Sequence, residues 1–349
     1  MKRRNLLIAA TSAPFFANSF AQTKPPIADS HNHFGIAMRK DTDISEKIGI
    51  HMRDSGVSLL SWTVVPDALF LGFSIFSGIV QNKIPAPGEI SVSFNKQLDR
   101  VLVKLEKNDV KIVRTVSDLD ESAKGIPYAV LTSEGADFLE GDLSQLAHAY
   151  DRGVRHVQLV HYIKNLVGDM QTDKPVFNGL SDFGKSLITG LNQAGILIDV
   201  AHSTPNSIDQ ALEITKVPLI WSHSFISDTE TSWTTSGYKS RGLPVSHAKK
   251  IAAKGGAVGL WALGATYGNS IDGYATEIMR MVDLLGAEHV MFGSDEDGLP
   301  FGAVLKDLID LRKVVDTLEK RGMNSETIHA VAFGNYARCL RTAMTARAI

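Results

Sequence analysis

Strand-like and helical runs alternate along almost the whole 349-residue chain, and this alternation restricts the fold more than any other feature. Amphipathic segments such as SVSFNKQLDRVLVKLEKN and TEIMRMVDLLG separate most of the apolar runs. The apolar runs, rich in β-branched residues, are residues 27–31, 57–65, 110–116, 127–133, 156–161, 195–203, 217–224, 256–263 and 289–298. Such alternation predicts a parallel sheet whose strands are joined by helices.

The glycine-rich turns of nucleotide-binding sheets, GxGxxG and GxxxxGK[ST], do not occur in the sequence. The number of candidate strands suits a closed barrel, so we predict an α/β fold of the (β/α)8 TIM-barrel type rather than an open sheet. In such a barrel the active site lies at the C-terminal ends of the strands.

The first 21 residues resemble a targeting segment rather than part of this fold. MKRR provides a positive end, an apolar stretch follows, and SFA before Gln22 supplies small residues for signal peptidase. The pair in RRNLL also resembles a twin-arginine signal, so both the Sec and the Tat export routes stay open. We predict a signal peptide over 1–21, a single barrel domain over 22–349, and an exported protein, periplasmic or secreted, that keeps no transmembrane segment after cleavage.

Composition argues against two classes of site. The formal net charge is −2 and no block of Lys or Arg stands out, so the chain lacks the basic footprint of a nucleic-acid binder. Cys339 is the single cysteine, which excludes a disulfide or a cysteine-based zinc site within one chain. We expect this thiol to be buried and inert.

Several histidines and carboxylates stand where apolar runs end, the place where a barrel carries its chemistry. These residues are His31 and His33, Glu134, His161, His202, His223 and Asp295. A single histidine at a strand end is more often a hydrogen-bonded structural residue than a ligand. Convergence of several imidazoles and a carboxylate on one mouth is difficult to explain by packing, and these groups are good ligands for zinc or a similar divalent ion.

The pair His202 and His223 is the strongest part of this pattern. Both residues end consecutive strands in similar contexts, AHS and SHS, one strand–helix–strand unit apart, so their imidazoles should be neighbours. Four histidines and one bridging glutamate suffice for two ions. SDEDG lacks the ligand spacing of a calcium loop, and we reject that alternative.

At these residues the chain resembles the membrane dipeptidase (renal dipeptidase) family, peptidase family M19, of amidohydrolase-like zinc peptidases. The most specific part is GLSDFGKSLITGLNQAGILIDVAHS followed by PLIWSHS, where length, spacing and flanking residues agree. The other matching motifs, each with the family's version, are ADSHNHFG (DGHND), SEGAD (EGG), VRHVQLVHYIKN (the segment with a substrate-side histidine), SRGLP (RNVPD), FGSDEDG (GGDFDG) and GNYARCL (NLLRVF).

The resemblance implies two zinc ions bridged by Glu134. One ion would be held by His31 and the residue at position 33, and the other by His202 and His223. The family has an aspartate where this chain has His33, which gives the HxH pair of other amidohydrolase-like barrels. A neutral nitrogen in place of an anionic oxygen raises the net charge of the site by one and should acidify its bound water.

The resemblance also implies a reaction, the hydrolysis of small dipeptides with a free C-terminal carboxylate by a hydroxide that bridges the metals. His161 would stabilise the oxyanion, Asp295 would move the proton from the water to the leaving amine, and Arg241 would pair with the substrate carboxylate. Without the family match, an Arg in the loop SRGLP would be interpreted as a solvated surface charge.

Other functions and features stay open at this point. His33 favours an amidohydrolase-like enzyme for another small amide, lactone or ester, and a metal-loaded binding protein or inactive homologue is the third possibility. Where the family has an aromatic pocket segment the chain reads WALG, so a pocket tyrosine is not expected there. The apolar loop at 66–92 could line the pocket, pack as a helix on the barrel or form a dimer contact; we favour core packing or dimerisation. The family resemblance makes a homodimer one expected state.

Overall fold

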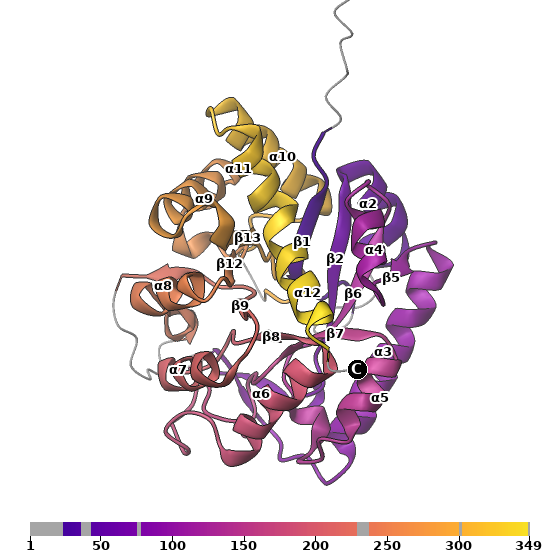
Figure 1. The fold of residues 1–349 in the computed structure, drawn as a ribbon, viewed down its shortest axis with the longest axis vertical. Coiled ribbons are helices and arrows are strands. Elements are labelled where there is room, and N and C mark those ends of the chain that lie inside the picture. The colour runs from indigo at the N-terminus through magenta and orange to yellow at the C-terminus, as the bar shows by residue number, and fades with distance from the viewer. Residues whose placement is uncertain (1–23, 36–42, 75–77, 229–236, 300–301, 348–349) are drawn as a thin grey trace, which may run out of the picture.

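The computed structural model describes residues 24–35, 43–74, 78–228, 237–299 and 302–347 (Figure 1). The predicted signal peptide, residues 1–21, lies outside these ranges, so it stays a prediction.

The described residues contain a nearly closed barrel of parallel strands, as predicted from the sequence (Figure 1). Two backbone hydrogen bonds join the first strand to the segment after the last: Asp295 N donates to His31 O at 2.9 Å, and His33 N donates to Glu296 O at 2.9 Å. In barrel order the strands are β1 (Ile27–Asn32), β2 (Val57–Val64), β6 (Tyr128–Ser133), β7 (Val154–Gln158), β8 (Leu197–Asp199), β9 (Ile220–Trp221), β12 (Ala257–Leu260) and β13 (Val290–Phe292).

The candidate strand at 110–116 is the clearest error of the sequence-based prediction. Only β5 (Lys111–Ile112) forms there, and it pairs with the first residues of β6, off the barrel path. From Val116 the chain is helical, because Thr115 and Asp118 form a capping box that starts α4 (Val116–Ser122). Local capping therefore outweighs the β propensity of the valines.

The loop at 66–92 and a later loop that follows β9 each carry a small sheet. Within 66–92, the described residues form a short 3-10 helix, η1 (Ala68–Phe70), and an antiparallel hairpin of β3 (Leu71–Ser74) and β4 (Gly78–Gln81), and no α-helix begins among them before Glu89. In the later loop, β10 (Ile226–Ser227) pairs with β11 (Leu243–Pro244).

Helices cover the outside of the barrel (Figure 1), and their buried apolar residues belong to the same core clusters as those of the strands. Typical caps set their ends: Ser181 accepts a hydrogen bond from Gly184 N at the start of α6, and Gly195 ends that helix with a φ of 70°. In addition to α4, the described residues form the α-helices α1 (Asp43–Glu46), α2 (Ile48–Ser55), α3 (Glu89–Lys107), α5 (Gln145–Asp151), α6 (Asp182–Ala194), α7 (Pro205–Ile214), α8 (Val245–Ala253), α9 (Ile271–Leu285), α10 (Leu308–Lys320), α11 (Ser325–His329) and α12 (Asn335–Thr345).

The N-terminal end of the barrel is closed by α12, the yellow helix that crosses the strands in Figure 1. Its Tyr336, Cys339 and Leu340 pack against Leu59 and Tyr128 at the beginnings of β2 and β6. Cys339 is buried, as expected, and burial raises the pKa of its thiol to about 11. Because apolar side chains fill this end of the barrel, the polar residues lie at the opposite, C-terminal end of the strands.

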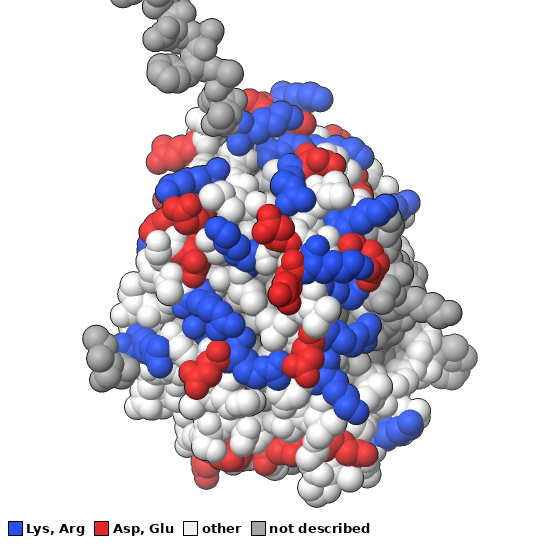
Figure 2. Space-filling model, turned by 90° about the vertical axis from the view of Figure 1, so that its right-hand side faces the viewer, with Lys and Arg blue, Asp and Glu red and all other residues white. Residues whose placement is uncertain are grey.

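Within the described part of the chain, no helix combines the length and the apolarity needed to cross a bilayer. On the face shown in Figure 2, Lys and Arg alternate with Asp and Glu rather than gathering into a patch of one sign.

Candidate metal centre

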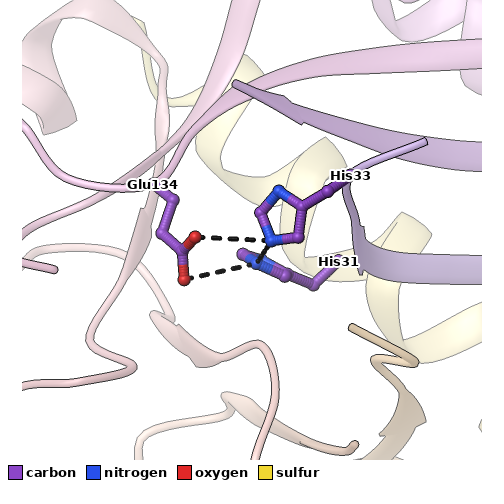
Figure 3. A group of neighbouring side chains, drawn as sticks. All are labelled: His31, His33 and Glu134. Carbon is purple, nitrogen blue, oxygen red and sulfur yellow. Dashed lines mark hydrogen bonds and ion pairs between the residues drawn. The ribbon is translucent and has the colours of Figure 1, made fainter. Parts of the chain in front are cut away.

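Glu134 lies at the centre of the predicted ligand set, just beyond the end of β6. Its two oxygens face two histidines from the end of β1: Oε1 lies 3.5 Å from His31 Nε2 and Oε2 lies 3.4 Å from His33 Nε2 (Figure 3). The two ring nitrogens lie only 3.0 Å from each other. All three side chains are buried.

A second histidine pair faces the same carboxylate. His202 follows β8 and His223 follows β9, and their Nε2 atoms lie 3.0 and 3.5 Å from Glu134 Oε1. Their Nε2 atoms are 3.2 Å apart. The ring of His223 also stacks on that of His31, with centroids 3.8 Å apart. Glu134 thus stands between two pairs of imidazoles.

Buried backbone contacts fix these strand ends. Asp199 Oδ1 accepts hydrogen bonds from Ala201 N and Ser222 N, and therefore joins the two segments that lead to His202 and His223. Gly259 has no side chain because a Cβ there would lie 1.8 Å from the Ser222 carbonyl oxygen. His202 has a φ of 67°, in the left-handed region that histidine seldom adopts, a strain often found at functional sites.

The local electrostatics suit a cation. Burial opposes ionisation of Glu134, but the neighbouring His161 and His31 hold the pKa of its carboxyl well below the usual range. Burial also lowers the pKa values of His202 and His223 well below the ordinary value, and positive neighbours add to this effect. The second pair is therefore neutral and has lone pairs to donate.

The pKa of His33 is shifted in the opposite direction. Burial by itself lowers the pKa of its imidazole, but the hydrogen bond to Asp295 and the charge of Glu134 outweigh it and raise the pKa to about 9. Its Nδ1 lies 3.1 Å from the Thr63 carbonyl oxygen, which leaves Nε2 directed at Glu134.

The donor set fits divalent metal ions. Two facing imidazole nitrogens 3.0 to 3.2 Å apart can share at most one proton, so at least one nitrogen of each pair presents a lone pair. Buried charges at such density are normally paired or coordinate metals. Among the described residues, three groups have ligand atoms within 4.8 Å of one another: His31, His33 and Glu134; His31, His223 and Asp295; and Glu134, His202 and His223. Imidazole and carboxylate ligands suit zinc.

Asp295 and His161 also lie at this mouth. Asp295 Oδ1 is 3.3 Å from His33 Nε2, and Asp295 has a φ of 55°, a second left-handed residue in the site. His161 follows β7, and its Nε2 lies 3.2 Å from Glu134 Oε2. Both side chains are thus placed to meet a molecule bound at the cluster.

Arg241 is buried, with only 3% of its surface exposed, so the interpretation as a solvated surface charge is wrong. It ends the short helix η3 (Gly237–Arg241), and its Nη2 lies 3.2 Å from His223 Nε2. The Ser224 hydroxyl donates to its backbone carbonyl and holds the loop to the end of β9.

Asp67 is a site residue that the sequence analysis missed. Its carboxylate is fully buried and accepts hydrogen bonds from His161 Nδ1 at 2.8 Å and from Tyr162 N at 3.3 Å. A carboxylate on one ring nitrogen fixes the orientation of the imidazole. A usable signal was present, because Asp67 stands just after the apolar run 57–65 and hence at the same mouth.

Known proteins resemble the chain in sequence. The family model for membrane dipeptidase (peptidase family M19) matches residues 17–348. An uncharacterized dipeptidase of Schizosaccharomyces pombe is 27% identical over 317 residues, 84% of this chain and 74% of that protein. A dipeptidase of Aspergillus oryzae is 27% identical over 61% of this chain and 50% of its own length, so the chain spans about half of that relative.

Solved structures show the same fold. A metallopeptidase from Rhodobacter sphaeroides bound to a phosphinate mimic of L-Ala-D-Ala has a TM-score of 0.75 at 19% identity, over 91% of this chain and 99% of that one. An amidohydrolase from Pseudomonas aeruginosa has a TM-score of 0.72 at 20% identity, over 92% and 97%. Because the family model covers nearly the whole sequence, the chain belongs to the membrane dipeptidase family, peptidase family M19, a class of metallo-dipeptidases.

Proposed function

We propose that this protein hydrolyses small dipeptides with a free C-terminal carboxylate and uses two zinc ions. Glu134 would bridge the ions, His31 and His33 would hold one, and His202 and His223 the other. The observation that carries the proposal is the single buried carboxylate facing two pairs of imidazole nitrogens. When bound, the metal ions supply a water acidic enough to attack at neutral pH and polarise the carbonyl under attack.

The chain's own residues orient the substrate and move the proton. Both ring nitrogens of His161 face carboxylate oxygens, those of Asp67 and Glu134, an arrangement in which a protonated ring donates from both sides. His161 Nε2–H can then donate to the oxyanion that develops on the substrate. Asp295 takes the proton of the attacking water and returns it to the leaving amine, and Arg241 pairs with the C-terminal carboxylate.

Two measurements on the purified protein test this proposal together. Elemental analysis should give two zinc ions per chain, and an unblocked dipeptide should be cleaved much faster than its C-terminal amide. No turnover across a broad dipeptide panel by the zinc-loaded protein would refute it.

Replacing Asp67 by asparagine should lower dipeptide hydrolysis by about 10- to 100-fold, the usual cost of losing a partner that orients a site histidine. Asparagine keeps the size but loses the charge that holds His161. Steady-state kinetics should show the loss with metal content unchanged. Asp209→Asn is the matched control, because Asp209 pairs with His247 in a histidine–carboxylate contact away from the site. Unchanged kinetics in D67N would contradict the role given to Asp67.

His33 favours a second candidate, an amidohydrolase-like enzyme acting on another small amide, lactone or ester. Faster turnover of such compounds than of any dipeptide would establish it.

Replacing His33 by aspartate, the family's residue at this position, tests whether His33 tunes the dipeptidase reaction or directs the enzyme to another class of substrate. The exchange makes the site one unit more negative, which raises the pKa of the attacking water. Since the ionised form attacks, activity is lost as pH falls through that pKa, and the acidic limb of the kcat/KM profile should move to higher pH. His148→Asp, the same charge change at an exposed site, is the control. An acidic limb that stays in place would show that His33 does not tune the reaction.

Two further proposals concern the protein's location and assembly. Residues 1–21 support export to the periplasm or outside the cell, and family membership supports a homodimer; both stay predictions.

A further inference from the structure

Arg241 is a buried cation whose donors are poorly satisfied. Its Nη1 donates to the Tyr162 hydroxyl at 3.3 Å and its Nη2 meets His223 Nε2 at 3.2 Å, while its Nε has no partner. Among the described residues Arg241 forms no ion pair with a carboxylate, although only 3% of its surface is exposed. A guanidinium removed from water without an anion is costly, so this position calls for an anionic ligand.

Two aromatic rings flank the guanidinium. Its central carbon lies 5.9 Å from the ring centroid of Tyr162 and 5.6 Å from that of Trp261, both within cation–π range. Trp261 is held in place: its Nε1 donates to Thr266 Oγ1, and Tyr267 donates to its backbone carbonyl. The two rings therefore restrict the position of the Arg241 guanidinium before a substrate binds.

Tyr162 connects this fork to the metal cluster. It directly follows His161, and its ring stands edge-on to His161 and to His202, with centroids 4.6 and 4.9 Å apart. Its hydroxyl oxygen accepts from Arg241, which leaves the hydroxyl proton free to donate elsewhere. The Tyr162 hydroxyl is thus a second hydrogen-bond donor next to the Arg241 guanidinium, and the Tyr162 ring lies against the rings of His161 and His202.

We propose that the Tyr162 hydroxyl and the Arg241 guanidinium together bind the C-terminal carboxylate of the substrate, with Trp261 as the fixed wall behind them. This inference rests on the proposed dipeptidase function and names a specificity-determining residue within it. A carboxylate has lone pairs for a bidentate fork and for one further donor, so the phenol adds a third hydrogen bond. Tyr162 thereby makes the site select a free acid over an amide.

The test compares wild type and Tyr162→Phe in the zinc-loaded protein. Calorimetry would measure the Kd of a phosphinate dipeptide mimic with a free carboxylate and of its C-terminal amide. Because a hydrogen bond to a charged group contributes a factor of about 10 to 100, Y162F should bind the acid weaker by that factor and the amide unchanged. The ratio of kcat/KM for acid and amide dipeptides should fall equally.

Two further variants keep the test specific. In an Arg241→Met background, Tyr162→Phe should change acid binding much less than in wild type, because the two residues act on one group. Tyr274→Phe removes another buried hydroxyl, one that donates to Leu260 O at 2.7 Å, and should leave the acid-to-amide ratio unchanged.

Each contrary result has a distinct meaning. Equal weakening of acid and amide in Y162F would show that Tyr162 only packs in the site, and loss of zinc would show that it acts through His202; either overturns the inference while the dipeptidase function stands. Equal binding of acid and amide by the wild type would overturn the free-acid specificity itself.

Discussion

A Glu134→Gln variant should fold but lose both metal ions and more than about 100-fold of its hydrolytic rate, beyond the 10- to 100-fold cost of removing an outer-shell partner. The reason is that one side chain faces both imidazole pairs, at 3.0 to 3.5 Å from all four rings. Glutamine keeps the shape but brings neither the negative charge nor a second oxygen ligand. A single substitution therefore weakens two binding sites.

Elemental analysis and steady-state kinetics on the same preparation would check this result. Glu121→Gln provides the same chemical change away from the site, at a half-buried residue of α4 that pairs with Lys124. If E134Q kept two ions per chain, Glu134 would not be the bridging ligand and the arrangement proposed for the centre would be wrong.

The strand-end rule explains why the proximity of these histidines to Glu134 could be predicted from the sequence. His31, Glu134, His202 and His223 all follow apolar runs, and parallel strands bring the ends of those runs to one mouth whatever the details of packing. The rule needs no knowledge of loops. It placed these four residues together, and the structure agrees.

The same rule says little about loops that return to the mouth. Arg241 lies far from any barrel strand in sequence, and its burial depends on how residues 237–244 fold back over β9. Tyr162 next to it carries no pattern of its own, since a tyrosine beside a histidine is common in cores. Asp67 could have been found, but its partner His161 comes from β7, and the pairing of a loop residue with a strand end needs three dimensions.

Local signals also misled the strand prediction at residues 110–116, where a β-branched run overlaps a helix-capping motif. VKIVRTV is rich in β-branched residues, yet the capping box of Thr115 and Asp118 starts a helix inside it. Capping prevails over strand pairing here, and β5 pairs with β6 through only two residues.

A second large effect is expected at Asp295, where asparagine should lower kcat by about 10² to 10⁴, the range for losing a general acid–base group. KM should change little, because the carboxylate acts on the proton rather than on substrate binding. The backbone favours this substitution: Asp295 has a φ of 55°, and asparagine is among the residues that tolerate the left-handed region. A drop in rate could therefore not be ascribed to misfolding.

Metal content decides which role Asp295 has, because the structure allows two. Its carboxylate lies 3.3 Å from His33 Nε2 and also groups with His31 and His223 as a possible ligand. If Asp295 carries the proton, D295N should keep two ions per chain. If Asp295 is a metal ligand, D295N should lose one ion. Asp297→Asn is the matched control, since Asp297 has a φ of 61° and belongs to none of the metal-binding groups found among the described residues. A normal kcat in D295N would remove Asp295 from the mechanism, and the proton would then have to pass through another group at this mouth.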